Sequence, residues 1–167
     1  MLSVIIATHD NAATLGAALA DLVPAAVDGL VREVIIADAG SSDATLEIAD
    51  DAGAVIVPGS GSAGERLAAG CAVAKSAWLL VLPPSPRLAP GWERPLSAAL
   101  EGAPQASFWL PAEGAMPWSK ADALLVSRAA YDRAGGFRPG SSPVAHLLRR
   151  LAPPKRALKL SGRGGRR

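Results

Sequence analysis

Carboxylates at the exits of predicted strands are the residues whose type and position could do chemistry in this chain. Residues 34–37 form an apolar run short enough for a buried strand, and Asp38 follows it directly. Gly40 and Ser41 then turn the chain toward a helix. In an open parallel sheet, ligands bind at the edge where strands end, because loops and helix amino termini converge there. Asp38 is therefore a candidate ligand contact.

A second carboxylate, Asp10, follows an earlier apolar run at residues 3–7. If the two strands are parallel neighbours, Asp10 and Asp38 lie at the same sheet edge. Carboxylates accept hydrogen bonds from base N–H groups and ribose hydroxyls but repel phosphates, so they suit the nucleoside end of a nucleotide. The alternative for each is a turn or a helix cap. That alternative is stronger for Asp43, which is placed to cap the next helix.

Strand and helix patterns alternate along most of the chain, which predicts one α/β domain over residues 1–152. The sheet is expected to be mixed but mostly parallel, with helices on both faces. Residues 153–167 are expected to form a flexible basic tail. Strands are predicted at 3–7, 34–37, 54–57, 78–82, 106–110 and 123–126, and helices at 12–22, 43–52, 63–76, 91 or 92 to 100, 128–134 and 143–151.

Residues 59–64, Gly-Ser-Gly-Ser-Ala-Gly, match the spacing of the dinucleotide-binding fingerprint. That site also needs an acidic residue at the end of the next strand, about 20 residues on, to hold the ribose. Here the next strand runs into Pro83, Pro84 and Ser85. The fingerprint also normally follows a first strand, whereas this one follows a third. A plain Gly/Ser loop is the favoured interpretation.

Charge is unevenly distributed along the 167 residues, although the net charge is only +2. All acidic residues lie at or before Asp132, and most basic residues follow it. The basic end could contact an anionic membrane surface weakly, or it could be a solvated terminus; no nucleic-acid partner is expected. The sequence shows no secretory signal and no apolar run near the roughly 20 residues that cross a bilayer, so a cytoplasmic location is expected.

Several motifs, taken in order, resemble the inverting family 2 glycosyltransferases of GT-A fold. They are Ser-Val-Ile-Ile-Ala-Thr-His-Asp-Asn at 3–11, Asp-Ala-Gly-Ser-Ser-Asp-Ala-Thr at 38–45, Trp-Leu-Leu-Val-Leu at 78–82 and Gly-Gly-Phe at 135–137. The Gly/Ser loop is similar to that of a small bacterial branch, the radical-SAM/selenodomain-associated transferases. The resemblance spans about residues 2–137. It implies a nucleotide-diphospho-sugar transferase fold, a Rossmann-like three-layer sandwich.

The resemblance also implies a nucleotide site at the ends of the first two strands. Thr8, Asp10 and Asp38 would line it, with Asp38 accepting a hydrogen bond from the base and Asp10 near the ribose or base. Ser41 and Asp43 would shape the adjoining loop. The implied partner is a nucleotide sugar such as a UDP- or GDP-sugar.

This sequence departs from the family pattern at two places. The family holds a divalent cation, Mg²⁺ or Mn²⁺, with an Asp-x-Asp motif or a single Asp after the fourth strand, where this chain has Pro-Pro-Ser-Pro at 83–86. No metal ligand is therefore predicted, and Arg66 and Arg87 are the candidates for binding the diphosphate. The family's catalytic base is commonly an aspartate ahead of the last helix, where this chain has Pro-Val-Ala-His at 143–146. The candidates for the base are His146 in that stretch and Asp122 before the sixth predicted strand.

Two functions remain open from the sequence. The first is a glycosyltransferase that moves a sugar from a nucleotide-diphosphate sugar to an unknown acceptor by direct displacement at the anomeric carbon. The second is a non-catalytic relative that binds a nucleotide or a protein. The short stretch between residues 100 and 122 leaves little room for an acceptor-binding segment, so the sequence indicates a pocket more firmly than a reaction.

Overall fold

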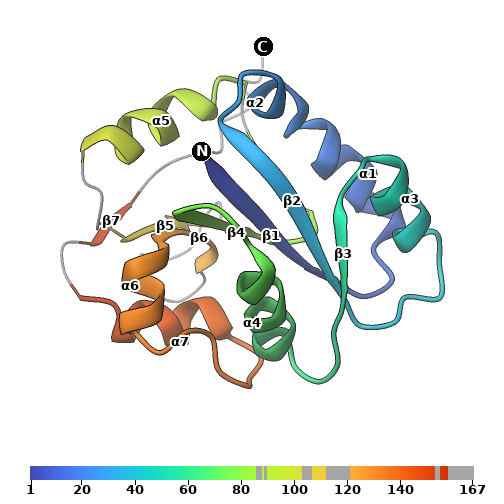
Figure 1. Ribbon diagram of the computed structural model, residues 1–167. Coiled ribbons are helices and arrows are strands. Elements are labelled where there is room, and N and C mark those ends of the chain that lie inside the picture. Colours follow the sequence, from blue (N-terminus) through green and yellow to red (C-terminus); the bar gives the residue numbers. More distant parts are fainter. Residues whose placement is uncertain (86–87, 89, 103–106, 112–120, 153–154, 158–167) are drawn as a thin grey trace, which may run out of the picture.

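Seven strands form one sheet in the order β3-β2-β1-β4-β6-β5-β7 (Figure 1). The computed structural model describes residues 1–85, 88, 90–102, 107–111, 121–152 and 155–157. All paired neighbours are parallel except β6, which runs antiparallel to both β4 and β5. The expected mostly parallel mixed sheet is confirmed. The strands are β1 Leu2–Thr8, β2 Val31–Asp38, β3 Val55–Pro58, β4 Trp78–Leu82, β5 Ser107–Pro111, β6 Ala121–Ser127 and β7 Lys155–Ala157.

Helices cover both faces of the sheet and complete a three-layer sandwich (Figure 1). One face carries α1 (Ala12–Ala20), α2 (Val23–Val27), α3 (Thr45–Asp51) and α5 (Glu93–Gly102). The other face carries α4 (Ala63–Val73), α6 (Arg128–Arg133) and α7 (Pro143–Arg150). In the described part of the chain, no helix is long and apolar enough to span a bilayer.

The central strand β1 contributes to both hydrophobic cores because successive side chains of a strand point to opposite faces. Val4 and Ile6 pack in the core under α1 and α5, while Ile5 packs in the core under α4 and α7. All three side chains are fully buried. A strand covered on both faces reads as a continuous apolar run, which is why the pattern at the start of the chain predicts it correctly.

The β1–β2 register places the ends of these two strands side by side. Ile5 pairs with Ile35, and the last pair is Thr8 with Asp38. On its other side, β1 pairs with β4, with Ile6 opposite Leu82. Strand order thus runs in one direction from β1 to β3 and in the other from β1 to β4. Between β1 and β4 the sheet has a topological switch point, where open α/β sheets bind ligands.

Three differences from the sequence prediction have local causes. Pro24 lies in the first turn of the separate helix α2, a position to which proline is well suited. The helix expected from residue 43 begins at Thr45 instead. The Asp43 carboxylate accepts from the Thr45 N–H, which places Asp43 in the turn before the helix. Residues Lys155–Ala157 of the expected tail form β7 beside β5. The rest of that tail lies outside the described residues, so its separation from the domain stays a prediction.

Candidate functional site

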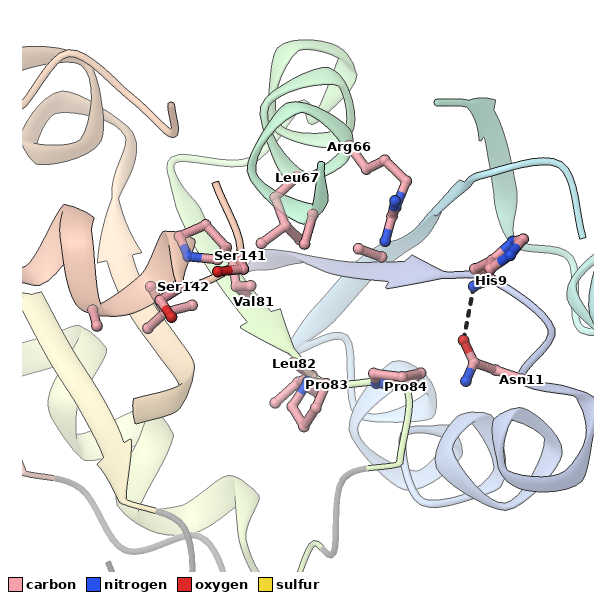
Figure 2. A pocket seen from close by; sticks show the side chains of 15 residues that line it. His9, Asn11, Arg66, Leu67, Val81, Leu82, Pro83, Pro84, Ser141 and Ser142 are labelled. Atoms are coloured by element: carbon pink, nitrogen blue, oxygen red, sulfur yellow. Dashed lines mark hydrogen bonds between the residues drawn. The ribbon is translucent and has the colours of Figure 1, made fainter. Parts of the chain in front are cut away.

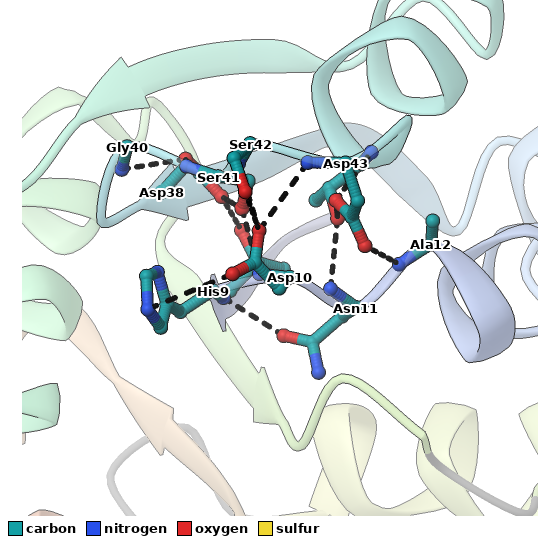
Figure 3. A network of polar contacts seen from close by, with 11 residues as sticks. His9, Asp10, Asn11, Ala12, Asp38, Gly40, Ser41, Ser42 and Asp43 are labelled. Carbon is teal, nitrogen blue, oxygen red and sulfur yellow. Dashed lines mark hydrogen bonds and ion pairs between the residues drawn. The ribbon is translucent and has the colours of Figure 1, made fainter.

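The loops that follow β1 and β2 are joined by hydrogen bonds into one unit (Figure 3). It contains every residue for which the sequence predicts nucleotide binding, and we call this set the loop clamp: Thr8, Asp10, Asp38, Ser41 and Asp43. The structure therefore brings the five residues together, as their positions after neighbouring parallel strands require.

Asp38 is the buried centre of the loop clamp, with 2% of its surface exposed. Its Oδ1 accepts hydrogen bonds from the backbone N–H groups of Gly40 at 2.8 Å and Ser41 at 2.7 Å. Its Oδ2 accepts from Thr8 Oγ1 at 2.7 Å and Ser41 Oγ at 2.6 Å. Burial alone would raise the pKa of Asp38, but the bonds from Ser41, Thr8 and Gly40 outweigh it and hold the pKa below its ordinary value.

Asp10 ties the first loop to the second. Its Oδ1 accepts from the backbone N–H of Ser42 at 2.7 Å and of Asp43 at 3.3 Å, and its own N–H donates to Ser41 Oγ at 2.8 Å. Asp10 has a φ of 52°, in the left-handed region that non-glycine residues rarely occupy. The bonds across the two loops hold the backbone in this conformation.

Asp43 closes the loop clamp from the side of the second loop. Its Oδ2 accepts from the backbone N–H of Ala12 at 3.0 Å, and its Oδ1 accepts from the N–H of Thr45 at 2.9 Å and from the Thr45 hydroxyl. The hydrogen bond from the Thr45 hydroxyl is the main cause that lowers the pKa of Asp43. Asp43 thus accepts from the first N–H of α3, although the N-cap residue of that helix is Ala44 and not Asp43 as expected.

The oxygens of Asp38 are filled by donors of the chain itself, since a carboxylate offers about four lone-pair sites and Asp38 accepts four hydrogen bonds. Thr8 is fully buried, and its hydroxyl donates to Asp38. This geometry supports the turn role for Asp38. Direct contact between Asp38 and a base stays a prediction.

A pocket of about 460 Å³ opens next to the loop clamp, at the switch point between β1 and β4 (Figure 2). Its walls come from four parts of the fold: the exits of the two strands, the first turns of α4, and the loop and first turn of α7. The described lining residues are Ala7 in β1, His9 and Asn11 after it, Ala63, Arg66 and Leu67 on α4, residues 81–84 at the end of β4, and residues 141–145 at α7.

Arg66 is the candidate diphosphate ligand that the structure places in the pocket wall (Figure 2). Its Nη1 donates to the carbonyl of Gly61 at 2.9 Å. Its Nε is buried and, among the described residues, has no hydrogen-bond partner. The second candidate, Arg87, lies outside the described residues.

The Gly/Ser loop before α4 is closed to phosphates by its own helix cap. Ser62 and Glu65 form a capping box, in which the Glu65 carboxylate accepts from the Ser62 N–H at 2.7 Å. The hydrogen bonds from Ser62 also hold the pKa of Glu65 below its ordinary value. A dinucleotide fingerprint needs open N–H groups and no anion at this position. The plain-loop interpretation therefore fits the structure.

Gly64 serves packing instead of phosphate binding. A Cβ at this position would lie 1.9 Å from the carbonyl oxygen of Arg138. The Gly64 N–H donates to the Gly140 carbonyl at 3.3 Å, and the Gly140 N–H donates to Ser62 Oγ at 2.9 Å. These contacts fix the loop that leads into α7 against the start of α4, and so fix one wall of the pocket.

Neither catalytic-base candidate is among the described residues that line the pocket. His146 is exposed on the second turn of α7, whereas the first turn of that helix lines the pocket. Asp122 lies in β6, whose antiparallel register brings the start of that strand to the edge where β4 ends. The Asp122 side chain is outside what the structure describes. Both roles stay predictions.

A divalent cation does not fit the donors that the described part of this pocket offers. Mg²⁺ and Mn²⁺ prefer carboxylate and other oxygen ligands in octahedral geometry. No group of acidic, histidine or cysteine side chains in the described ranges could hold a metal ion, and the described lining of the pocket includes no carboxylate. The pocket instead carries the cation of Arg66.

His9 and Asn11 are pocket residues that the sequence reasoning missed, and the Asn11 Oδ1 accepts from the His9 N–H at 2.8 Å. The His9 side chain is 58% exposed, and its Nε2 lies 3.9 Å from Asp10 Oδ2. A signal was available, because these residues alternate with Asp10 in one loop. No comparable signal marks Ser141 and Ser142, which reach the pocket only through tertiary contacts.

A family model described as "Glycosyl transferase family 2" matches residues 3–83. Over this segment, the chain is similar to glycosyltransferase family 2. The matched segment runs from β1 to the end of β4. It therefore contains the whole loop clamp and the pocket residues at the ends of β1 and β4 and on α4. Nothing tests membership of the radical-SAM-associated branch, which stays a prediction.

Solved structures have the same fold as this chain. Glucosyl-3-phosphoglycerate synthase from Mycobacterium tuberculosis, in complex with Mn²⁺, UDP and glucosyl-3-phosphoglycerate, is 22% identical, with a TM-score of 0.75. The same enzyme with UDP alone is 20% identical, with a TM-score of 0.76. In both cases all of this chain and 73% of the other chain are covered. The likeness establishes the GT-A fold.

Among proteins of curated function, none matches the chain significantly.

Proposed function

We propose that this chain binds a nucleotide sugar in the pocket between β1 and β4 and acts as a glycosyltransferase-like protein. The observation that carries the proposal is the position of the pocket at the switch point of the sheet, beside the loop clamp of the segment that matches the family model. A cavity of about 460 Å³ is of the size that small-molecule sites usually have. The M. tuberculosis enzyme of the same fold binds UDP and UDP-glucose.

The nucleoside is expected near the loop after β1, where His9 and Asn11 line the pocket. An imidazole ring offers a flat face for stacking, and an amide side chain offers both donors and acceptors to a base or ribose. The hydrogen bonds of the loop clamp hold the loop that carries these two residues in position. Under this proposal, the predicted contribution of Asp10 and Asp38 to nucleotide binding is exerted largely through the loop.

For transfer, an acceptor hydroxyl would attack the anomeric carbon while the bond from that carbon to the diphosphate oxygen breaks. The hydroxyl proton must leave to a base, and catalysis by a positioned base requires it within hydrogen-bond reach. His146 and Asp122 are the candidates. The acceptor is unassigned.

A non-catalytic, nucleotide-binding relative is the second candidate function. It is favoured by one observation, which is that the described lining of the pocket has no carboxylate that could act as a base. Binding and turnover therefore need separate measurements.

The test is calorimetric titration of the purified chain with UDP, GDP, UDP-glucose and a GDP-hexose, followed by an assay for nucleotide release from whichever sugar binds. We expect saturable binding of one nucleotide series. His9→Ala should weaken it, while His146→Ala should leave binding unchanged and reduce only turnover. Absence of binding for all four compounds would contradict the proposal, and binding without turnover would favour the non-catalytic relative.

A further inference from the structure

The acidic side chains that the structure describes around the pocket accept hydrogen bonds that hold the fold together. Asp38, Asp10 and Asp43 accept hydrogen bonds within the loop clamp. Glu65, beside the pocket on α4, accepts from the Ser62 backbone and hydroxyl in the capping box. A metal ion that used both oxygens of any of these four carboxylates would have to compete with these donors. Competition of that kind would also dismantle the loops and the helix cap.

The guanidinium of Arg66 is in the opposite situation. It forms no ion pair within the part of the chain that the structure describes, its Nε is buried without a partner, and only Nη1 is bonded, to the Gly61 carbonyl. A partly buried cation without an anion is costly, so such a group indicates a missing anionic partner. The pocket that Arg66 lines is the place where that partner can bind.

The surrounding chain holds Arg66 in this position. A Cβ on Gly59 would lie 2.8 Å from Cγ of Arg66, so the glycine leaves the space that the stem of the arginine occupies. The bond to Gly61 fixes one end of the guanidinium. A preorganised arginine fork matches phosphate oxygens well and loses little entropy on binding.

The first turn of α7 adds donors on the opposite wall. Val144 and Ala145 line the pocket, and their N–H groups belong to the first turn, where a helix supplies no internal acceptors. The Ser142 side chain at the N-cap position makes no capping hydrogen bond. Together with Arg66, these groups form a set of donors suited to an anion.

We propose that the pocket binds the diphosphate of its nucleotide ligand through Arg66, without a divalent cation. The inference rests on the proposed nucleotide function and concerns how the charge of that ligand is neutralised. Two features support it. The pocket wall offers hydrogen-bond donors, and the described carboxylates nearby accept hydrogen bonds within the loop clamp and the capping box. Arg66 replaces the metal as the positive partner, and a cation bound beside it would be repelled.

The test compares UDP with uridine by calorimetry, each in EDTA and in Mn²⁺. For the unmodified chain, we expect the affinity for UDP to be the same in both buffers and higher than that for uridine. Arg66→Gln should weaken UDP binding by about tenfold or more, as the loss of a charge-assisted bond predicts, and leave uridine binding unchanged. Arg32→Gln removes an equal charge from an exposed position on β2 and should change neither affinity.

UDP binding that appears only with Mn²⁺ would overturn this inference and leave the nucleotide function standing. Equal losses for UDP and uridine in Arg66→Gln would also overturn it, because they would indicate a purely structural role. If that variant does not fold, Arg66→Lys and the metal comparison on the unmodified chain provide the test. Failure of both UDP and uridine to bind under either condition would overturn the nucleotide function as well.

Discussion

The loop clamp and the neighbouring pocket use polar groups in opposite ways. In the loop clamp, the carboxylates of Asp10, Asp38 and Asp43 are bonded to donors of the chain. In the pocket wall, the Arg66 guanidinium lacks an anionic partner among the described residues. A satisfied polar network stabilises a fold, whereas a polar group left unpaired at a cavity is available to a ligand.

Two roles are therefore carried by different residues: shaping the loops and facing the ligand cavity. The sequence motif at 38–45 carries the resemblance to the family, but its carboxylates shape the loops. The groups that face the cavity come from His9, Asn11, Arg66 and the start of α7. We therefore expect changes in the loop clamp to affect stability first, and changes in the pocket wall to affect binding first.

Asp38→Ala should have the largest effect on stability. It removes the acceptor of four hydrogen bonds in a site that is 2% exposed and leaves their donors without a partner. From the cost of unsatisfied buried groups, we expect a loss of about 2–4 kcal/mol in the free energy of unfolding. Urea denaturation followed by circular dichroism measures it.

Asp50→Ala is the matched control, because Asp50 is exposed near the end of α3 and should change stability by no more than about 0.5 kcal/mol. If Asp38→Ala kept the stability of the unmodified chain and lost only nucleotide binding, Asp38 would be a ligand contact, and the assigned difference between loop clamp and pocket would be wrong.

Gly64→Ala should have the next largest effect and tests the pocket wall. The added Cβ would lie 1.9 Å from the Arg138 carbonyl oxygen, so the start of α4 and the loop before α7 must move apart. We expect a loss of about 1–3 kcal/mol in stability, as for overpacked sites, together with weaker nucleotide binding. Thermal unfolding and calorimetry measure the two effects.

Gly102→Ala provides the comparison, since a Cβ there meets nothing within 4 Å. It should leave both stability and binding close to those of the unmodified chain. A Gly64→Ala variant with the same two values would show that the close approach of α4 to the 138–140 loop does not shape the pocket.

Much of the sheet could be predicted from the sequence because buried parallel strands are short, continuous apolar runs. The run at 78–82 predicts β4 at its observed bounds, and the runs at 3–7 and 34–37 fall within β1 and β2. The adjacency of Asp10 and Asp38 also follows from parallel strands with right-handed connections. In contrast, β7 has three residues and no apolar pattern of its own.

The site could be predicted only in part. The sequence places Asp38 at the right edge of the sheet, but whether its oxygens face a ligand or the chain depends on loop geometry that has no sequence signal. Thr8 and Asp10 bond to the second loop, while His9 between them lines the pocket. The contribution of residues 141–145 depends on the contact of Gly64 with the 138–140 loop, which joins distant parts of the chain.

The most direct test of the central claim is a ¹H–¹⁵N chemical-shift titration of the chain with UDP-glucose, which a protein of 16.9 kDa permits. We expect the largest shifts on backbone amides of the pocket wall, at His9, Asn11, Arg66, Ser141, Ser142, Val144 and Ala145. The backbone amides of Gly40 and Ser41, which donate to Asp38, should keep their hydrogen bonds and shift less. Largest shifts at these two amides, or no saturable shifts in the pocket wall, would contradict the central claim.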